Sequence, residues 1–268
     1  MTAVHATEVG DTGARVVFLH GLMGQGKNFT SIAKALLPDA RSLLVDLPSH
    51  GRSEWLDHVD YLEYADLVAD RIRAWGEPVH LVGHSMGGKV AMVLAQRHPD
   101  LIERLVIVDI TPGHSEGASE FDHLLGSLDR LDLASLTRRA DADAGLKDAI
   151  PSDTVRGFLL QNLRSVPPSE GGGFAWQPNL KMLLSSLDVI GGFPDLDTTF
   201  DHPVLWIAGE TSEYIDDEDH PAMRRLFPHT RFVTIKGAGH WVHSEQPTAF
   251  VSALKVFLQL ESHESRSA

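Results

Sequence analysis

Six short apolar runs constrain the fold of this chain more than any other feature. Each is rich in Val, Ile or Leu and ends in a turn: ARVVFLHG, RSLLVDLPSHG, PVHLVGHSMGG, ERLVIVDITPG, HPVLWIAGE and RFVTIKGAGH. Continuous apolar runs are typical of strands that are buried on both faces of a parallel sheet. Residues 28–37, 61–75 and 86–99 repeat apolar side chains every three or four positions, which predicts helices between the early strands. We therefore predict an α/β chain with a doubly wound, mostly parallel sheet.

The alternation of strands and helices stops after Pro112 and resumes at Val204. The segment between them carries mostly helical patterns and one glycine run, SEGGG, which we interpret as a linker. A chain of 268 residues favours one domain with an insertion over two equal domains. We expect residues 1–112 and 198–268 to form the core. Residues 113–197 are then a helical cap over the carboxyl ends of the strands, where such sheets bind ligands.

Composition argues against several classes of protein. The formal net charge of −14 disfavours a nucleic-acid-binding surface and binding to anionic lipid. The chain has no cysteine, so it has neither a disulfide framework nor a thiol nucleophile. Its first residues lack the basic and apolar regions of a signal peptide, and no apolar stretch approaches the ~20 residues that span a bilayer. We expect a cytoplasmic protein; the sequence leaves the oligomeric state open.

A serine stands between a predicted strand and a predicted helix, in Gly83-His84-Ser85-Met86-Gly87. A serine on such a sharp turn has a strained backbone, and only small residues two positions away avoid a collision. The strain lifts the hydroxyl clear of the sheet, and the start of the helix favours developing negative charge. We predict that Ser85 is a nucleophile. The alternative is a tight turn with a serine that faces solvent.

A serine hydroxyl needs a base before it can attack a carbonyl. In the strand–turn–helix arrangement, the histidine comes last along the chain. Here His240 follows the last predicted strand on a glycine-bearing loop, and His243 is its competitor. Their His-x-x-His spacing also suggests zinc, but no third ligand is evident nearby and no Glu lies between them. We therefore favour His240 as the base and expect no metal.

The loop from Gly21 to Lys27 permits a second interpretation. It reads GLMGQGK, one residue short of a phosphate-binding P-loop. However, Asn28 stands where a P-loop needs a Ser or Thr hydroxyl for magnesium. A P-loop protein also gives no reason for the turn at Ser85 or the loop at His240. We expect Lys27 to be solvated, and a P-loop-like nucleotide-binding protein stays a remote alternative.

Taken together, these motifs resemble the α/β-hydrolase superfamily, and within it the small esterase branch of bacterial esterases and mitochondrial α/β-hydrolase-domain proteins. The matching segments span nearly the whole chain and are HGLMG, DLPSHGRS, GHSMGGKVAM, VDITP, NLKMLL and GAGHWVHSEQP. The resemblance implies an oxyanion hole built from the backbone N–H groups of Leu22 and Met86. It implies no metal and no organic cofactor.

The activity implied is that of a serine hydrolase. Such an enzyme would cleave small-molecule carboxylic esters of short to medium acyl chains through an acyl-enzyme. An acyltransferase or a thioesterase with the same Ser-His-acid triad is the alternative.

The acid of the triad is the least determined position. Many family members carry an Asp in a turn that here reads AGETSEYI, with Ser212 near the expected place. Another position used in the superfamily corresponds to Asp109, at the end of the run LVIVD. A carboxylate at the end of a buried strand is costly without a partner, so we favour Asp109. The alternatives are Asp188, Glu210 and Glu213.

The cap is expected to supply an apolar acyl pocket. Its candidate wall residues, several of which will instead pack the cap onto the core, are Leu124, Leu128, Phe158, Leu159, Trp176, Leu183 and Leu187. Two histidines beside the motifs, His20 and His84, are expected to orient turns through side-chain-to-backbone hydrogen bonds. Ser49 and His50 are expected to shape the loop that follows the second apolar run.

Overall fold

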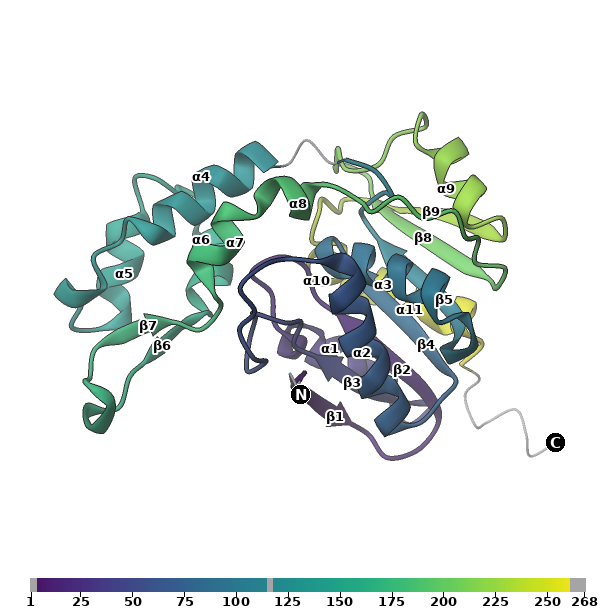
Figure 1. Ribbon diagram of the computed structural model, residues 1–268, viewed down its shortest axis with the longest axis horizontal. Helices are drawn as coiled ribbons and strands as arrows, with labels where there is room; N and C mark the ends of the chain where they lie inside the picture. Colours follow the sequence, from purple (N-terminus) through teal and green to yellow (C-terminus); the bar gives the residue numbers. More distant parts are fainter. Residues whose placement is uncertain (1–3, 115–117, 261–268) are drawn as a thin grey trace.

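A seven-stranded sheet forms the centre of the computed structural model, which describes residues 4–114 and 118–260 (Figure 1). The strand order is β1-β3-β2-β4-β5-β8-β9; β1 pairs antiparallel to β3, and the other neighbours are parallel. The strands are β1 (Ala6–Val9), β2 (Ala14–Leu19), β3 (Ala40–Val45), β4 (Val79–His84), β5 (Ile102–Val108), β8 (Val204–Gly209) and β9 (Thr230–Ile235). All six apolar runs are confirmed as strands. The edge strand β1 was not predicted, because it is short and only partly buried.

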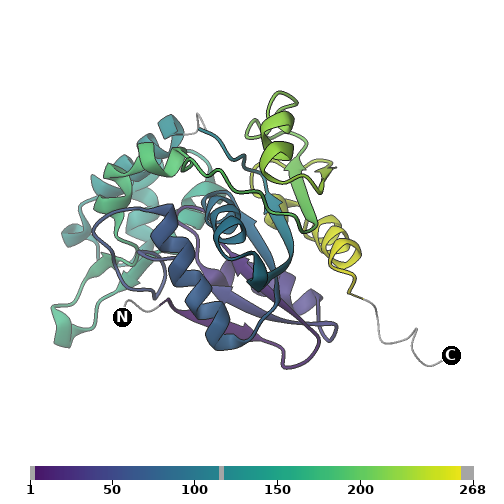
Figure 2. The same cartoon turned by 45° about the vertical axis from the view of Figure 1, so that its right-hand side comes forward.

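Helices cover both faces of the sheet, as the doubly wound prediction requires (Figures 1 and 2). Val17 and Leu19 of β2 join the apolar cluster of α2 and α3, whereas Val16 and Phe18 join the cluster of α1 and α11. Successive residues of a strand point to opposite faces, so burial on both faces explains the uninterrupted apolar runs. The helical elements of the core are η1 (Gly26–Phe29), α1 (Thr30–Ala35), α2 (Tyr61–Trp75), α3 (Met86–Arg97), η2 (Pro99–Leu101), α9 (His220–Leu226), α10 (Val242–Glu245) and α11 (Pro247–Leu258).

The segment between β5 and β8 forms a separate layer to one side of the sheet, at the left of Figure 1. Its elements are α4 (Ala118–Asp129), η3 (Leu133–Ser135), α5 (Arg139–Leu146), α6 (Asp153–Leu160), β6 (Leu163–Ser165), η4 (Pro168–Glu170), β7 (Phe174–Trp176), α7 (Leu180–Ser185) and α8 (Leu187–Gly191). The layer is mostly helical and also contains an antiparallel pair, β6 and β7. The glycine run that we interpret as a linker connects these two strands, and Gly171, Gly172 and Gly173 have positive φ there.

Buried polar side chains fasten this cap to the core. Asn162, which is fully buried, donates to the carbonyl of Met23 (2.7 Å) and accepts from the Gln25 amide (2.7 Å). The Tyr61 hydroxyl at the start of α2 donates to the carbonyl of Ile190 (2.7 Å). These bonds hold the cap beside the carboxyl ends of the strands. Within the described ranges, no helix is both long and apolar enough to cross a membrane.

Candidate active site

Ser85 occupies a strained turn between β4 and α3. Its backbone has φ 52° and ψ −122°, a region that side chains other than glycine rarely adopt. A Cβ on Gly83 would lie 2.4 Å from the carbonyl oxygen of Gly87, and a Cβ on Gly87 would lie 2.5 Å from that of His20. Only glycine fits at either position, because a side chain would collide with backbone that cannot move aside. The steric prediction for this turn is confirmed.

An acid and an imidazole from opposite halves of the chain meet beside this turn. The Nδ1 atom of His240, which follows β9, lies 2.8 Å from Oδ2 of Asp109 at the end of β5. The Asp109 side chain is fully buried, and its Oδ1 accepts from the backbone N–H of Gly209 (3.0 Å). The hydroxyl of Ser212 donates to the same Oδ2 that His240 contacts. Both oxygens of the buried carboxylate are therefore satisfied, and Nε2 of the imidazole is left for another partner.

The alternative acids lie elsewhere. The side chains of Asp188, Glu210 and Glu213 are all exposed, and Glu210 accepts from the backbone N–H of Gly237 (2.8 Å) in the turn after β9. Of the four candidates, Asp109 is the one that contacts the imidazole. Ser212, in the turn where the resemblance led us to look for the acid, instead donates a hydrogen bond to Asp109.

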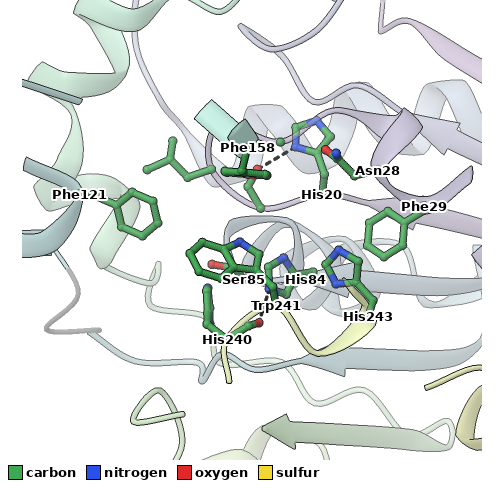
Figure 3. Close-up of a pocket in the computed structure, with 13 residues that line it drawn as sticks. His20, Asn28, Phe29, His84, Ser85, Phe121, Phe158, His240, Trp241 and His243 are labelled. Atoms are coloured by element: carbon green, nitrogen blue, oxygen red, sulfur yellow. Dashed lines mark hydrogen bonds between the residues drawn. The ribbon is translucent and has the colours of Figure 1, made fainter. Parts of the chain in front are cut away.

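Ser85 and His240 line one cavity, together with His20, Phe121, Phe158 and Trp241 (Figure 3). Within the described part of the chain, the hydroxyl of Ser85 makes no direct hydrogen bond to the imidazole of His240. Catalytic hydrogen bonds are often long without substrate and tighten in the complex. The structure therefore places Ser85 and His240 on one cavity, with His240 in contact with Asp109.

Leu22 and Met86, whose backbone N–H groups were predicted to form the oxyanion hole, line the cavities beside Ser85. Leu22 lines both this cavity and an adjoining one, which Met86 and Ser85 also line. Neither of these two N–H groups donates to an acceptor among the residues that the structure describes. By contrast, the backbone N–H of Met23 donates to Nε2 of His50 (3.2 Å). Met86 opens α3, whose N-terminus carries partial positive charge. Two N–H groups without an acceptor among the described residues, at residues that line the cavities beside the Ser85 hydroxyl, form an arrangement that can hold an oxyanion.

The comparisons with known proteins concern the chain as a whole. Residues 14–247 match the family described as alpha/beta hydrolase fold, which is most of the chain. This chain belongs to the α/β-hydrolase family. The resemblance inferred from the sequence motifs, and the fold it implied, are thereby confirmed.

Individual relatives of this α/β-hydrolase carry the names of ester-cleaving enzymes. The chain is 37% identical over 255 residues to the sn-1-specific diacylglycerol lipase ABHD11 of Danio rerio, covering 91% of this chain and 78% of that protein. It is 30% identical over 244 residues to the esterase YbfF of Escherichia coli, covering 91% and 92%. A solved marine microorganism esterase shares 32% identity with a TM-score of 0.92, covering 96% of this chain and all of that one.

Buried neutral histidines shape the site of this α/β-hydrolase. His20 donates from Nδ1 to the carbonyl of Gly21 (2.8 Å) and accepts at Nε2 from the backbone N–H of Leu47 (3.0 Å). His50 likewise donates from Nδ1 to the carbonyl of Pro48 (3.0 Å). Burial lowers the pKa of His20 and lowers that of His50 to about 3, so both rings stay neutral. They orient turns, as predicted, and His50 positions the residue after Leu22.

His84 joins the nucleophile turn to the histidine loop. Its Nε2 donates to the backbone carbonyl of His240 (2.8 Å), and burial lowers its pKa well below the usual value. His243, the competitor for the role of base, is buried and stacks on Phe29 with 4.5 Å between ring centroids. Burial, and secondarily the charge of His240, lower its pKa to about 4. It contacts no carboxylate within the described ranges, so the geometry favours His240.

One residue that contacts the imidazole was not predicted. The ring of Tyr214 stacks on that of His240, with 3.9 Å between centroids and 21° between planes. Tyr214 lies in the loop after β8, in a stretch without periodicity, so no local pattern indicates that it reaches the site. It also lines the second cavity beside Ser85.

The predicted cap wall is correct only in part. Phe158 lines the first cavity and Leu187 the second, whereas the unpredicted Phe121 lines both. The remaining predicted residues belong to the packing between and beneath the cap helices; these are Leu124, Leu128, Leu159, Trp176 and Leu183. Helical periodicity shows which face of a cap helix is apolar, but not which part of that face meets a cavity.

The remaining alternatives concern phosphate and metal. The loop at Gly21 packs against the serine turn, since a Cβ added to Gly21 would lie 3.1 Å from the Cβ of Ser85. The Lys27 side chain is exposed. The loop therefore lies against the serine turn, and the one lysine that could serve a phosphate site there is exposed. Over residues 4–114 and 118–260, no group of three or more His, Asp or Glu side chains is placed to hold a metal ion.

Proposed function

We propose that this chain is a serine esterase that acts through the triad Ser85, His240 and Asp109. The observation that carries the proposal is the 2.8 Å contact between Asp109 and His240, beside a cavity that His240 shares with Ser85. A buried carboxylate on Nδ1 fixes the tautomer in which Nε2 is unprotonated and can act as a base. That is the arrangement a serine needs before it can attack an ester.

In the first half of the reaction, Ser85 Oγ attacks the ester carbonyl and its proton passes to Nε2 of His240. The carbonyl oxygen becomes an oxyanion that accepts hydrogen bonds from Leu22 N–H and Met86 N–H. Asp109 stabilises the imidazolium that forms. The tetrahedral intermediate then expels the alcohol oxygen, which takes the proton from His240, and the acyl group remains on Ser85.

In the second half, a water molecule takes the place of the alcohol. His240 removes one of its protons as the water oxygen attacks the acyl-enzyme, and the same two N–H groups hold the second oxyanion. Collapse of this intermediate releases the carboxylic acid and returns the proton to Ser85. The cycle consumes one ester and one water and needs no other reactant.

The walls beside Ser85 favour small apolar acyl groups. The second cavity is lined mainly by the apolar side chains of Leu22, Met86, Ile110, Phe121, Leu187 and Ile190. Apolar walls gain free energy from burying methylene groups and give a charged chain no partner. The relatives named as lipase and esterase are consistent with small-molecule esters as substrates. We propose short to medium acyl chains.

The test is turnover of p-nitrophenyl esters from acetate to octanoate by the wild type, Ser85→Ala and His240→Ala. We expect turnover by the wild type, and a loss of roughly 10³-fold or more in each variant at unchanged melting temperature. Full activity of Ser85→Ala would exclude the proposal. Adding an alcohol separates the rival function, because an acyltransferase would form a new ester in preference to the free acid.

A further inference from the structure

A buried lysine lies one turn below the nucleophile and is not used by the mechanism. Lys89 is in the first turn of α3, and its backbone N–H donates to the carbonyl of Ser85 (3.1 Å). Its side chain is 1% exposed, and no Asp or Glu in the described ranges lies within ion-pair distance of it. Burial lowers the pKa of Lys89 to about 7. A buried amine without an acid is costly, so its position demands compensating contacts.

Three backbone carbonyls supply these contacts. Lys89 Nζ donates to Gly113 (2.9 Å), Gly191 (2.5 Å) and Gly192 (2.8 Å). Gly113 lies where the chain leaves β5 for the cap, and the other two lie where it returns from α8 toward β8. The two connections between cap and core therefore meet at one nitrogen. An ammonium suits this place because it carries three N–H donors, one for each carbonyl.

The return connection is also a wall of the second cavity. Ile190 and Gly191 line this cavity together with Leu187, the side chain of Lys89 and the nucleophile Ser85. A shift of the return connection would thus change the shape of the space beside the hydroxyl. The contacts of Lys89 oppose that shift from the same helix that carries the nucleophile.

We propose that Lys89 is a positioning residue that fastens both cap connections to the nucleophile helix and thereby sets which acyl chains fit beside Ser85. This inference rests on the proposed esterase function. Lys89 does not touch the reacting atoms; it acts through the position of Ile190 and Gly191 and through its own place in the cavity wall. The consequence is a role in substrate selectivity, separable from the chemistry of the triad.

Tyr61 offers a matched control. Its hydroxyl donates to the carbonyl of Ile190, so it anchors the same return connection from α2. It does not line either cavity beside Ser85. Tyr61→Phe removes one hydrogen bond from the connection and leaves the three contacts of Lys89 in place. This variant therefore distinguishes a general weakening of the contacts between cap and core from a specific displacement of the cavity wall.

The experiment compares the wild type, Lys89→Met and Tyr61→Phe for kcat/KM on p-nitrophenyl acetate through octanoate. For Lys89→Met, we expect the ratio of octanoate to acetate to change by about tenfold or more, because one methylene in an apolar pocket is worth about that much discrimination. Labelling of Ser85 by a small fluorophosphonate should stay near the wild-type rate. For Tyr61→Phe, we expect a lower melting temperature and an unchanged ratio.

Two results would overturn the inference: an unchanged ratio in Lys89→Met, or an equal change in Tyr61→Phe. The first failure leaves the esterase proposal intact as long as the wild type turns over esters. If the wild type neither hydrolyses an ester nor labels at Ser85, the proposed function itself has failed. The two failures are therefore distinguishable.

A chemical rescue decides the question if Lys89→Met does not fold. The chain has no cysteine, so Lys89→Cys introduces a unique thiol. Alkylation of the unfolded chain with 2-bromoethylamine forms a carbon–sulfur bond, releases bromide and restores an ammonium at the same chain length; 1-bromopropane gives the same length without it. After refolding, the aminoethylated protein should regain the wild-type ratio and the propylated protein should not. Identical behaviour of the two would refute the proposal.

Discussion

Replacing Asp109 by Asn removes one charge and leaves the shape of the site unchanged. Three donors surround the carboxylate: the backbone N–H of Gly209 at Oδ1, and His240 and Ser212 at Oδ2. The backbone N–H cannot turn away, so the single oxygen of Asn must stay on Gly209. Its NH₂ group then faces His240, which forces the imidazole into the tautomer with the proton on Nε2. That tautomer cannot accept the proton of Ser85.

The magnitude follows from the distance between the two groups. A carboxylate and an imidazolium 2.8 Å apart attract by about 6 kcal/mol at an effective dielectric constant of about 20. This attraction exists only once the imidazole is protonated, so it lowers the barrier and not the energy of the resting enzyme. At about 1.4 kcal/mol per tenfold, its loss corresponds to a drop of roughly 10⁴ in kcat.

The assay is kcat on p-nitrophenyl butyrate, with the melting temperature as the control for folding. Asp188→Asn, Glu210→Gln and Glu213→Gln are matched variants that remove exposed carboxylates, and we expect near wild-type rates for all three. If Asp109→Asn folds and keeps its rate within about tenfold of the wild type, the assignment of the acid is wrong. A large loss in one of the three controls would move the acid there.

Two further predictions follow from the contacts of the site. Ser212→Ala removes one hydrogen bond from Oδ2 of Asp109, and kcat/KM should fall by roughly 10- to 100-fold, since a bond to a charged group contributes about 1.5–3 kcal/mol; a loss as large as that of Asp109→Asn would contradict this. His243 is neutral when folded, with its pKa lowered to about 4, so below its unfolded value of 6.5 the unfolded chain binds a proton that the folded chain does not. Stability should therefore fall as the pH falls through this window, by about 2–3 kcal/mol near pH 4.5 from His243 alone. Denaturant unfolding of His243→Phe should show a correspondingly shallower pH dependence, and an unchanged slope would exclude this source.

The parts of the site that were predictable depend on local constraints. The turn at Ser85 is marked within five residues: Gly83 is required by the backbone of Gly87 in the same turn, whereas Gly87 is required by the backbone of Leu19 and His20 at the end of the neighbouring strand β2. The six buried strands follow from apolar runs alone. Asp109 was favoured from the sequence, since a carboxylate at the end of an apolar run implies a partner, although Asp188, Glu210 and Glu213 stayed as alternatives.

The parts that were not predictable depend on contacts between distant segments. The amine of Lys89 is bound by backbone carbonyls, and no side-chain pattern marks a carbonyl as a partner. Tyr214 reaches His240 from an irregular loop. The pair of β6 and β7 is three residues long in each strand and lies within a region of helical patterns, so periodicity does not detect it. In each case the tertiary arrangement, which a local pattern does not contain, decides the contact.

The central claim is that the hydroxyl of Ser85 is activated by His240. Its most direct test is the mass of the adduct that a fluorophosphonate probe leaves on the protein. Trypsin should release residues 74–89, in which Ser85 is the only hydroxyl-bearing side chain, so the modified residue is identified without ambiguity. We predict stoichiometric labelling of this peptide in the wild type and none detectable in His240→Ala over the same time. Labelling elsewhere, or equal labelling of residues 74–89 in both proteins, would contradict the account.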